Sequence, residues 1–134
     1  MAVDGREGKT EAKGVALVGH CGPDSWMLKS MIKRTLPDAE VYKVDSAKEL
    51  EKTIGRTRVL LVNRVLGGRF GTSSGVELIR DLVSQNGDGP AAILISNYED
   101  AQAEAEAAGA LPGFGKSGLN SPSVAERLND AFNK

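Results

Sequence analysis

Short continuous runs of apolar residues alternate along the chain with longer segments in which apolar residues recur at helical spacing. The three clearest runs cover residues 15–18, 59–62 and 91–95. Because each run is continuous and does not alternate with polar residues, it is typical of a strand that is covered on both faces. Weaker apolar patterns predict two further strands, over residues 39–44 and 111–114.

Helices are predicted between and after these strands. The first, over residues 24–36, carries one apolar stripe made by Met27, Leu28, Met31, Ile32 and Thr35. Ser46 and Glu49 form a capping box that opens the second helix. Two more helices are expected over residues 76–83 and 99–108, and a last one over residues 122–132. Gly109 is expected to end the fourth helix, and Ser121 to cap the fifth ahead of a first-turn proline.

This order of elements predicts an α/β fold with a doubly wound, five-stranded parallel sheet and helices on both faces. No internal repeat or domain boundary interrupts the pattern, so we expect a single domain over residues 14–134. Residues 1–13 are polar, mixed in charge and without periodicity, which predicts a disordered N-terminal tail. In open sheets of this kind ligands bind beyond the carboxyl ends of the strands, so functional side chains should follow the strands.

Composition excludes several functions and compartments. The chain has 134 residues and a formal net charge of −1, which gives no electrostatic footprint for nucleic acid or for an anionic membrane. A single cysteine, Cys21, rules out an internal disulfide and fits a reducing compartment. The single histidine, His20, excludes a zinc site built from several Cys and His ligands. Charges near the N-terminus do not suit a signal peptide, so we expect a cytoplasmic protein.

Three stretches carry a resemblance to a known family: residues 61–66 together with 75–79, residues 95–98, and residues 106–116. They resemble, in order and at near-family spacing, the third strand with its following helix, the end of the fourth strand, and the lysine-bearing segment of response-regulator receiver domains. The resemblance covers essentially all of residues 14–133. It implies a flavodoxin-like sheet with strand order 2-1-3-4-5 and a relation to two-component phosphorelay signalling.

In that family a histidine kinase passes a phosphoryl group to an aspartate at the end of the third strand, and two acids after the first strand hold Mg²⁺. In this chain Asn63 stands at the acceptor position, and Gly19 and His20 stand at the two acidic positions. The family's hydroxyl and lysine are retained as Ser96 and Lys116. Because an amide does not form an acyl phosphate, these departures predict a degenerate phosphorylation site.

Asp24 is the weak candidate for a metal ligand near this site, but one carboxylate makes a poor Mg²⁺ site. We therefore expect no metal, no cofactor and no catalytic activity. The leading hypothesis is a pseudo-receiver, a non-phosphorylatable signalling module that acts by contact with a partner protein of unknown identity. A further alternative is an active receiver with displaced chemistry, which would use Asp24 and another acceptor.

The loop after the third strand suggests an alternative from another class. Residues 67–75 are rich in glycine and extend the loop by four residues beyond the family's usual spacing. Backbone N–H groups of such a loop can cradle a phosphate, and Arg69, Ser73, Ser74 and Lys116 are candidates for converging on it. This hypothesis predicts a domain that responds to an anion or a nucleotide. A flexible loop without a ligand is the competing interpretation.

Trp26 is the candidate interface residue. With about 100° of rotation per residue, it lies almost opposite the apolar stripe of its helix, beside Lys29 and Lys33. Tryptophan is enriched at the energetic centres of protein interfaces, so we expect an anchor for a partner protein. Packing of Trp26 onto the loop around Phe70 is the alternative. The resemblance also implies a possible homodimer, and the sequence leaves open whether Cys21 is redox-active.

Overall fold

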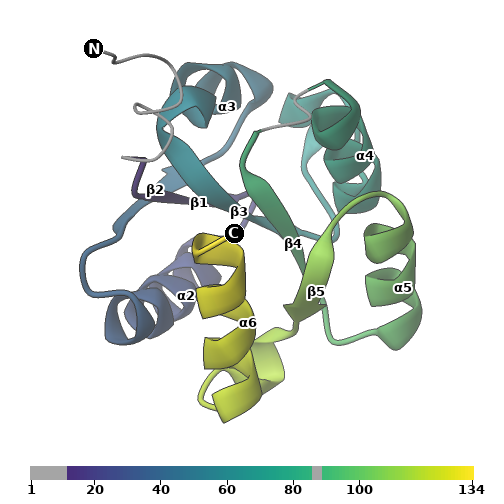
Figure 1. Ribbon diagram of the computed structural model, residues 1–134. Coiled ribbons are helices and arrows are strands. Elements are labelled where there is room, and N and C mark those ends of the chain that lie inside the picture. The colour runs from purple at the N-terminus through teal and green to yellow at the C-terminus, as the bar shows by residue number, and fades with distance from the viewer. Residues whose placement is uncertain (1–11, 86–88) are drawn as a thin grey trace.

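A computed structural model of the protein describes residues 12–85 and 89–134, which form one parallel sheet between two layers of helices (Figure 1). The strands are β1 (Gly14–Val18), β2 (Glu40–Val44), β3 (Thr57–Asn63), β4 (Ala91–Ile95) and β5 (Leu111–Phe114). All neighbours pair in parallel, in the order β2-β1-β3-β4-β5. The predicted fold class and the strand order implied by the resemblance are confirmed.

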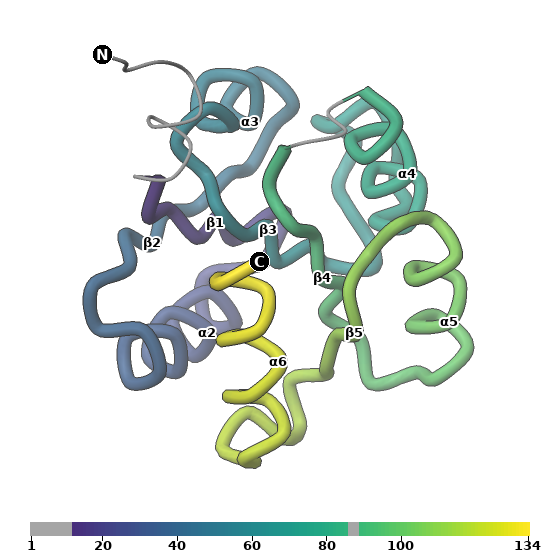
Figure 2. The backbone as a smooth tube through the Cα atoms, viewed as in Figure 1, coloured from purple at the N-terminus to yellow at the C-terminus, as the bar shows by residue number. Residues whose placement is uncertain are grey.

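The helices divide between the two faces of the sheet, as Figures 1 and 2 show. One face is covered by α2 (Gly22–Thr35) and α6 (Pro122–Phe132). The other is covered by α3 (Ala47–Thr53), α4 (Gly75–Gln85) and α5 (Glu99–Ala107). Three short 3₁₀ turns, η1 (Ile54–Arg56), η2 (Gly68–Phe70) and η3 (Lys116–Gly118), complete the described elements.

The continuous apolar runs arise because both faces of the sheet are buried. Along β3, Leu60 and Val62 point into the cluster beneath α3, α4 and α5, and Val59 and Leu61 point into the cluster beneath α2 and α6. All four side chains are at most 1% exposed. Successive strand residues face opposite sides of a sheet, so a strand covered on both sides requires an apolar residue at every position.

The predicted helix ends are present. The Ser46 side chain accepts a hydrogen bond from the Glu49 amide at 3.2 Å, and the Glu49 carboxylate accepts one from the Asp45 amide at 2.7 Å. The Ser121 side chain caps α6 through the Ser123 amide. Gly109 follows α5 with a φ of +114°, a left-handed conformation that favours glycine. Local sequence signals therefore set these helix boundaries.

One part of the predicted stripe on the first helix is wrong. The buried residues of α2 are Ser25, Leu28, Met31 and Ile32, whereas Met27 is 40% exposed. Met27 lies about 100° around the helix from Leu28, which carries it to the edge of the buried face. Its hydrophobicity suggested burial, but the buried stripe follows the spacing of Leu28 and Ile32.

The loop between β3 and α4, for which a flexible connection was one of the two interpretations, packs into the core. Leu66 and Phe70 are buried in the cluster beneath α3 and α4. The Leu66 amide donates to the Ser73 carbonyl at 2.8 Å, and Val65 forms an antiparallel bridge with Ser74. Two apolar anchors and a closing bridge thus account for the length of this loop.

A disordered N-terminal tail was predicted over residues 1–13. Residues 1–11 lie outside the part of the chain that the structure describes, whereas residues 12 and 13 are described. The carbonyl of Ala12 accepts a hydrogen bond from Arg58, and that of Lys13 accepts one from the Glu40 amide. Within residues 12–85 and 89–134, none of the helices has the length and apolar character needed to cross a membrane.

Candidate functional site

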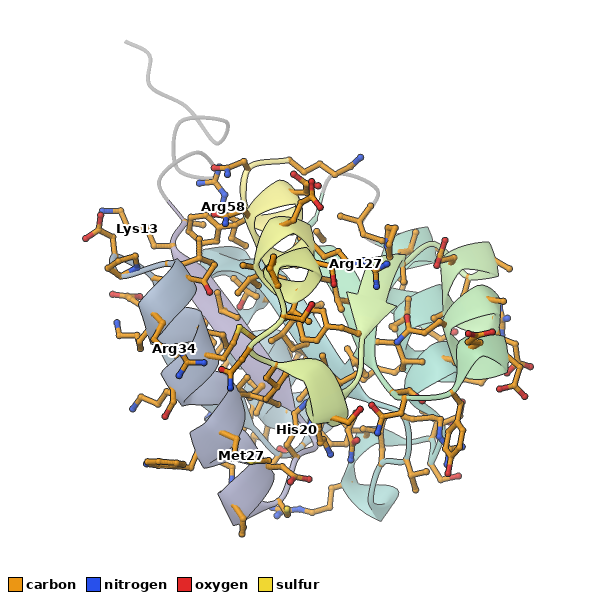
Figure 3. All side chains as sticks on the ribbon, turned by 90° about the horizontal axis from the view of Figure 1, so that it is seen from below. Lys13, His20, Met27, Arg34, Arg58 and Arg127 are labelled. Carbon is orange, nitrogen blue, oxygen red and sulfur yellow. The ribbon has the colours of Figure 1, made fainter. Side chains whose placement is uncertain are left out.

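The carboxyl ends of the strands bring most of the sequence-predicted site residues to one edge of the sheet, called here the carboxyl edge. Figure 3 shows His20 and Met27 at this end of the molecule, with Lys13 and Arg58 at the opposite end. A pocket of about 150 Å³ opens at this edge. It is lined by Asn63, Arg64, Val65, Ile95, Ser96, Asn97, Tyr98 and Lys116.

Asn63, at the end of β3, ties two loops together. Its Nδ2 donates hydrogen bonds to the carbonyl of Gly19 at 3.1 Å and to the carbonyl of Val65 at 3.0 Å. Both bonds need a donor, which an amide has and an ionised carboxylate lacks. At the position where the family carries its phospho-acceptor, this chain therefore uses the side chain as a structural clamp.

Gly19 has become a packing position. Its φ is +77°, a conformation that side chains other than glycine rarely adopt, and a Cβ built on it would lie 2.5 Å from the Leu66 side chain. The long loop that follows β3 thus fills the space where an acidic side chain would project. An acid cannot occupy position 19 without movement of Leu66.

His20, the second position that aligned with a metal-binding acid, is part of the buried structure. The side chain is 3% exposed, and its Nε2 donates to the Leu61 carbonyl at 2.9 Å. Nδ1 is buried with no hydrogen-bond partner among the described residues. Burial lowers the pKa of His20 from 6.5 to about 4, so the ring is neutral at pH 7. Cys21 is exposed, whereas the neighbouring His20 side chain is buried.

Lys116 and Asp24 form an ion pair across the edge. The Lys116 Nζ lies 2.6 Å from Asp24 Oδ2, and each side chain is 27% exposed. The hydrogen bond from Lys116 is the main reason why the pKa of Asp24 is lowered. Among the residues that the structure describes, no three His, Cys, Asp or Glu side chains are grouped to hold a metal ion. The weak metal candidate is thus engaged by the retained lysine.

Ser96 and Asn97 join the ends of β4 and β5. The Ser96 hydroxyl oxygen accepts a hydrogen bond from the Tyr98 amide at 3.1 Å. Asn97 Oδ1 accepts from the Ser117 hydroxyl at 3.0 Å. A Cβ on Gly115 would lie 1.6 Å from Asn97 Oδ1, so only glycine permits this close approach. The hydroxyl and lysine positions are held beside each other by this connection.

Arg64 and Tyr98 are site residues that our sequence analysis missed. The Arg64 guanidinium carbon lies 5.1 Å from the centroid of the Tyr98 ring, within cation–π range. Both side chains are exposed and line the pocket. The available signal was their position, since Arg64 follows Asn63 and Tyr98 comes two residues after Ser96 in parallel strands that end side by side.

The three loop candidates for an anion site are not among the residues that line the pocket with Lys116. The Ser74 side chain accepts a hydrogen bond from the Glu77 amide at the start of α4, and the Ser73 carbonyl accepts the bond from Leu66. Arg69 is exposed on η2. The structure gives Ser74 a capping role and does not bring the three side chains into the pocket.

Trp26 lies on the outer side of α2 with 71% of its surface exposed. Phe70 is buried in the core, so Trp26 does not take up the alternative packing against its loop. The exposed large hydrophobic residues of the described chain are Trp26, Met27, Val65 and Tyr98. All four follow the carboxyl ends of strands, so apolar surface gathers at the same edge as the pocket.

Comparison with family models and with curated proteins finds no match to this sequence. Solved structures do match. The receiver domain of a DNA-binding response regulator from Colwellia psychrerythraea 34H has a TM-score of 0.70 at 14% identity, over 90% of this chain and 98% of that one. A response regulator receiver protein from Pseudoalteromonas atlantica has a TM-score of 0.67 at 18% identity, over 90% and 97%.

The beryllofluoride-activated receiver domain dimer of NtrC4 has a TM-score of 0.68 at 20% identity, over 90% of this chain and 97% of that one. At these identities the likeness is one of fold. The chain therefore has the fold of response-regulator receiver domains, as its strand order already indicated.

Proposed function

We propose that this receiver-fold chain is a signalling module of the cytoplasm that accepts no phosphoryl group and acts by binding a partner protein. It performs no catalysis in this account. The proposal has two parts, the loss of phosphorylation chemistry and the use of the carboxyl edge as a binding surface. They rest on different observations.

The observation that carries the first part is the pair of hydrogen bonds donated by Asn63 to the carbonyls of Gly19 and Val65. An aspartate here would place an ionised oxygen against two carbonyl oxygens, which repel it. The geometry of the edge is thus adapted to a neutral donor. Phosphoryl transfer needs a nucleophile and neutralised charge, and the edge has an amide where the nucleophile would lie.

The fate of the neighbouring charges supports the same conclusion. Mg²⁺ prefers several oxygen ligands, usually carboxylates and water. At this edge Gly19 has no side chain, His20 is buried, and the Asp24 carboxylate is paired with Lys116. Each group that could contribute to a metal site has a structural role, so we expect no bound Mg²⁺ at physiological concentrations.

The second part is supported by exposed apolar surface. Trp26 and Met27 on the first turns of α2 are 71% and 40% exposed, although the indole N–H of Trp26 is the one strong hydrogen-bond donor of the two side chains. Tryptophan is among the residues that dominate interface energetics. A partner protein that covers this surface would remove apolar area from water, and this burial would favour the complex. A second copy of the chain is an alternative partner.

Incubation with acetyl phosphate and Mg²⁺, followed by intact-mass spectrometry, tests the first part. We expect no mass increase of one phosphoryl group in the wild-type chain. The matched variant Asn63→Asp restores a nucleophile without a metal site, and we expect it to remain unmodified as well. Hydroxylamine-sensitive phosphorylation of the wild-type chain would contradict the proposal and would favour an active receiver with displaced chemistry.

A further inference from the structure

We propose that the pocket at the carboxyl edge receives a carboxylate side chain, glutamate or aspartate, from the partner protein. This inference rests on the proposed function, since it specifies which chemistry the partner presents. The pocket would then be the polar centre of an interface whose outer parts are apolar. Three properties of the pocket support this: its hydrogen-bonding groups, its size and its rim.

The lining is rich in donors and contains no carboxylate. The Ser96 hydroxyl hydrogen, the Asn97 Nδ2 group and the Arg64 guanidinium have no hydrogen-bond acceptor within the described chain. Lys116 uses one of its three ammonium hydrogens on Asp24 and retains the others. Two cations and two neutral donors that face one space favour an anion, and they disfavour a metal ion or a basic side chain.

The size of the pocket favours a single side chain over a larger anion as the ligand. Its volume is about 150 Å³, whereas pockets for drug-sized ligands and cofactors usually measure about 300–1,000 Å³. A nucleotide does not fit into such a space, but the end of one acidic side chain does. A guanidinium binds a carboxylate through two parallel hydrogen bonds, and the exposed Arg64 supplies that group.

The rim of the pocket indicates a protein as the source of the carboxylate. Val65 and Tyr98 both line the pocket and are 57% and 60% exposed. Apolar side chains around a polar contact exclude water when a partner covers them, and this strengthens the central contact. A free ion would leave both side chains in water.

One ion pair links the pocket to α2. Lys116 lines the pocket and holds Asp24, which lies two residues before Trp26 in the first turns of α2. Two residues turn the helix by about 200°, so Trp26 points away from this ion pair, and the partner's acidic residue would reach Lys116 independently of Trp26. The carboxylate would share Lys116 with Asp24, and this competition can be measured.

Two capped dipeptides that differ only in charge test the inference: N-acetyl-glutamyl-leucinamide and N-acetyl-glutaminyl-leucinamide. Each is titrated into ¹⁵N-labelled protein without Mg²⁺, and amide shifts are followed. We expect saturable shifts at Arg64, Ser96, Asn97 and Lys116 with the glutamyl probe. The glutaminyl probe should bind at least about tenfold more weakly, because a charge-assisted hydrogen bond is roughly twice as strong as a neutral one.

Three variants sharpen the test. Arg64→Gln removes an exposed guanidinium and should reduce the difference between the two probes, with Lys116 retaining part of it, whereas Lys48→Gln, an exposed cation on α3, should leave it unchanged. Asp24→Asn releases Lys116 and should tighten binding of the glutamyl probe by about threefold, the scale of a partly exposed ion pair. These changes have opposite signs, so a general loss of folding cannot imitate them.

Equal shifts with both dipeptides, or no shifts with either, would overturn the inference. An orthophosphate titration distinguishes the source of the anion: saturable binding of phosphate with none of the glutamyl probe would mean a site for a free ion, which also overturns it. None of these outcomes bears on whether the chain can be phosphorylated. Failure here and failure of the acetyl phosphate test are therefore distinguishable.

Discussion

The interior of β3 is held by apolar packing, whereas the end of the same strand is held by directed hydrogen bonds. Leu60 and Leu61 are at most 1% exposed and contribute only apolar surface to the two cores. Two residues later, Asn63 is half-buried and acts through two directed hydrogen bonds. The interior of the strand depends on apolar volume, whereas its end depends on the hydrogen-bonding atoms of one side chain.

The difference teaches that the fold and the carboxyl edge are held by different kinds of contact. The apolar strands need only hydrophobic residues of suitable volume. The carboxyl edge keeps its shape through specific contacts: Asn63 clamps two loops, Leu66 packs against Gly19, and Lys116 pairs with Asp24. The positions that align with the family's phosphorylation residues thus make structural contacts in this chain.

The largest effect is expected from the interior of the strand. Leu61→Ala should destabilise the protein by about 3–4 kcal/mol, because it removes a buried side chain and leaves a cavity between β3 and α2. Urea denaturation followed by circular dichroism measures the loss. A decrease in the free energy of unfolding of less than about 1 kcal/mol would contradict the proposed difference between the interior of β3 and its end.

His20 should make stability depend on pH. Its pKa is about 4 in the folded state, against the ordinary value of 6.5 that an unfolded chain retains. Below pH 6.5 the unfolded state therefore binds a proton that the folded state does not. Stability should fall as the pH drops from about 6.5 to about 4, by up to about 3 kcal/mol.

Because His20 is the single histidine, the variant His20→Gln isolates its contribution. A glutamine can still donate to the Leu61 carbonyl, and it does not titrate. We expect the slope of stability between pH 6.5 and 5 to disappear in this variant, as measured by urea denaturation at each pH. A slope that persists unchanged would mean that another group causes it.

Asn63→Asp tests the end of the strand. The ionised carboxylate would face the carbonyls of Gly19 and Val65 and lose both hydrogen bonds, at a cost of about 2 kcal/mol. Repulsion by the two carbonyl oxygens raises the pKa of the introduced aspartate. The loss of stability should therefore decrease as the pH falls, because the protonated carboxyl group can donate a hydrogen bond. Asn63→Ala loses the bonds without the charge, and its deficit should not depend on pH.

Asp24 and Lys116 should couple only weakly. Both side chains are 27% exposed, and an ion pair at such exposure contributes about 0.5–1 kcal/mol. A double-mutant cycle with Asp24→Asn and Lys116→Met measures this coupling, which should decrease in 1 M NaCl. Additive effects of the two substitutions would show that the pair does not form in solution.

The smallest effect on stability is expected at Trp26. Trp26→Ala should change the free energy of unfolding by less than about 0.5 kcal/mol, as for other surface substitutions. Trp26 is also the single tryptophan, so the intrinsic emission reports its surroundings directly. We expect a spectrum of water-exposed indole that iodide quenches readily. A blue-shifted, unquenched spectrum would place the side chain in a contact and remove it as a free docking anchor.

The sequence predicted the fold because its signals are local and redundant. Continuous apolar runs indicated buried strands, and Ser46 with Glu49 and Gly109 indicated helix ends. Met27 was misplaced because hydrophobicity alone does not say which neighbours cover a residue. The resemblance to receiver domains aligned Asn63, Ser96 and Lys116, and the structure brings these three to one pocket.

The contacts of the site could not be predicted, because they join residues that are distant in the chain. Asp24 and Lys116 are separated by 92 positions in the sequence, and no local sequence pattern around either residue indicates that they pair. The pairing of Arg64 with Tyr98 depends on how far each loop extends beyond its strand. The role of the long loop depends on Leu66 and Phe70, which reach the core. The glycine-rich composition of the loop gave no indication of these two contacts.

The most direct test of the proposal that the chain accepts no phosphoryl group is an amide NMR spectrum recorded with Mg²⁺ and beryllofluoride together, and with each alone. Beryllofluoride imitates an acyl phosphate by binding to the acceptor carboxylate. We predict no change that requires both components, because Asn63 offers no carboxylate and no metal site supports it. Shifts at Asn63, Ser96 and Lys116 that appear only when both are present would contradict this account.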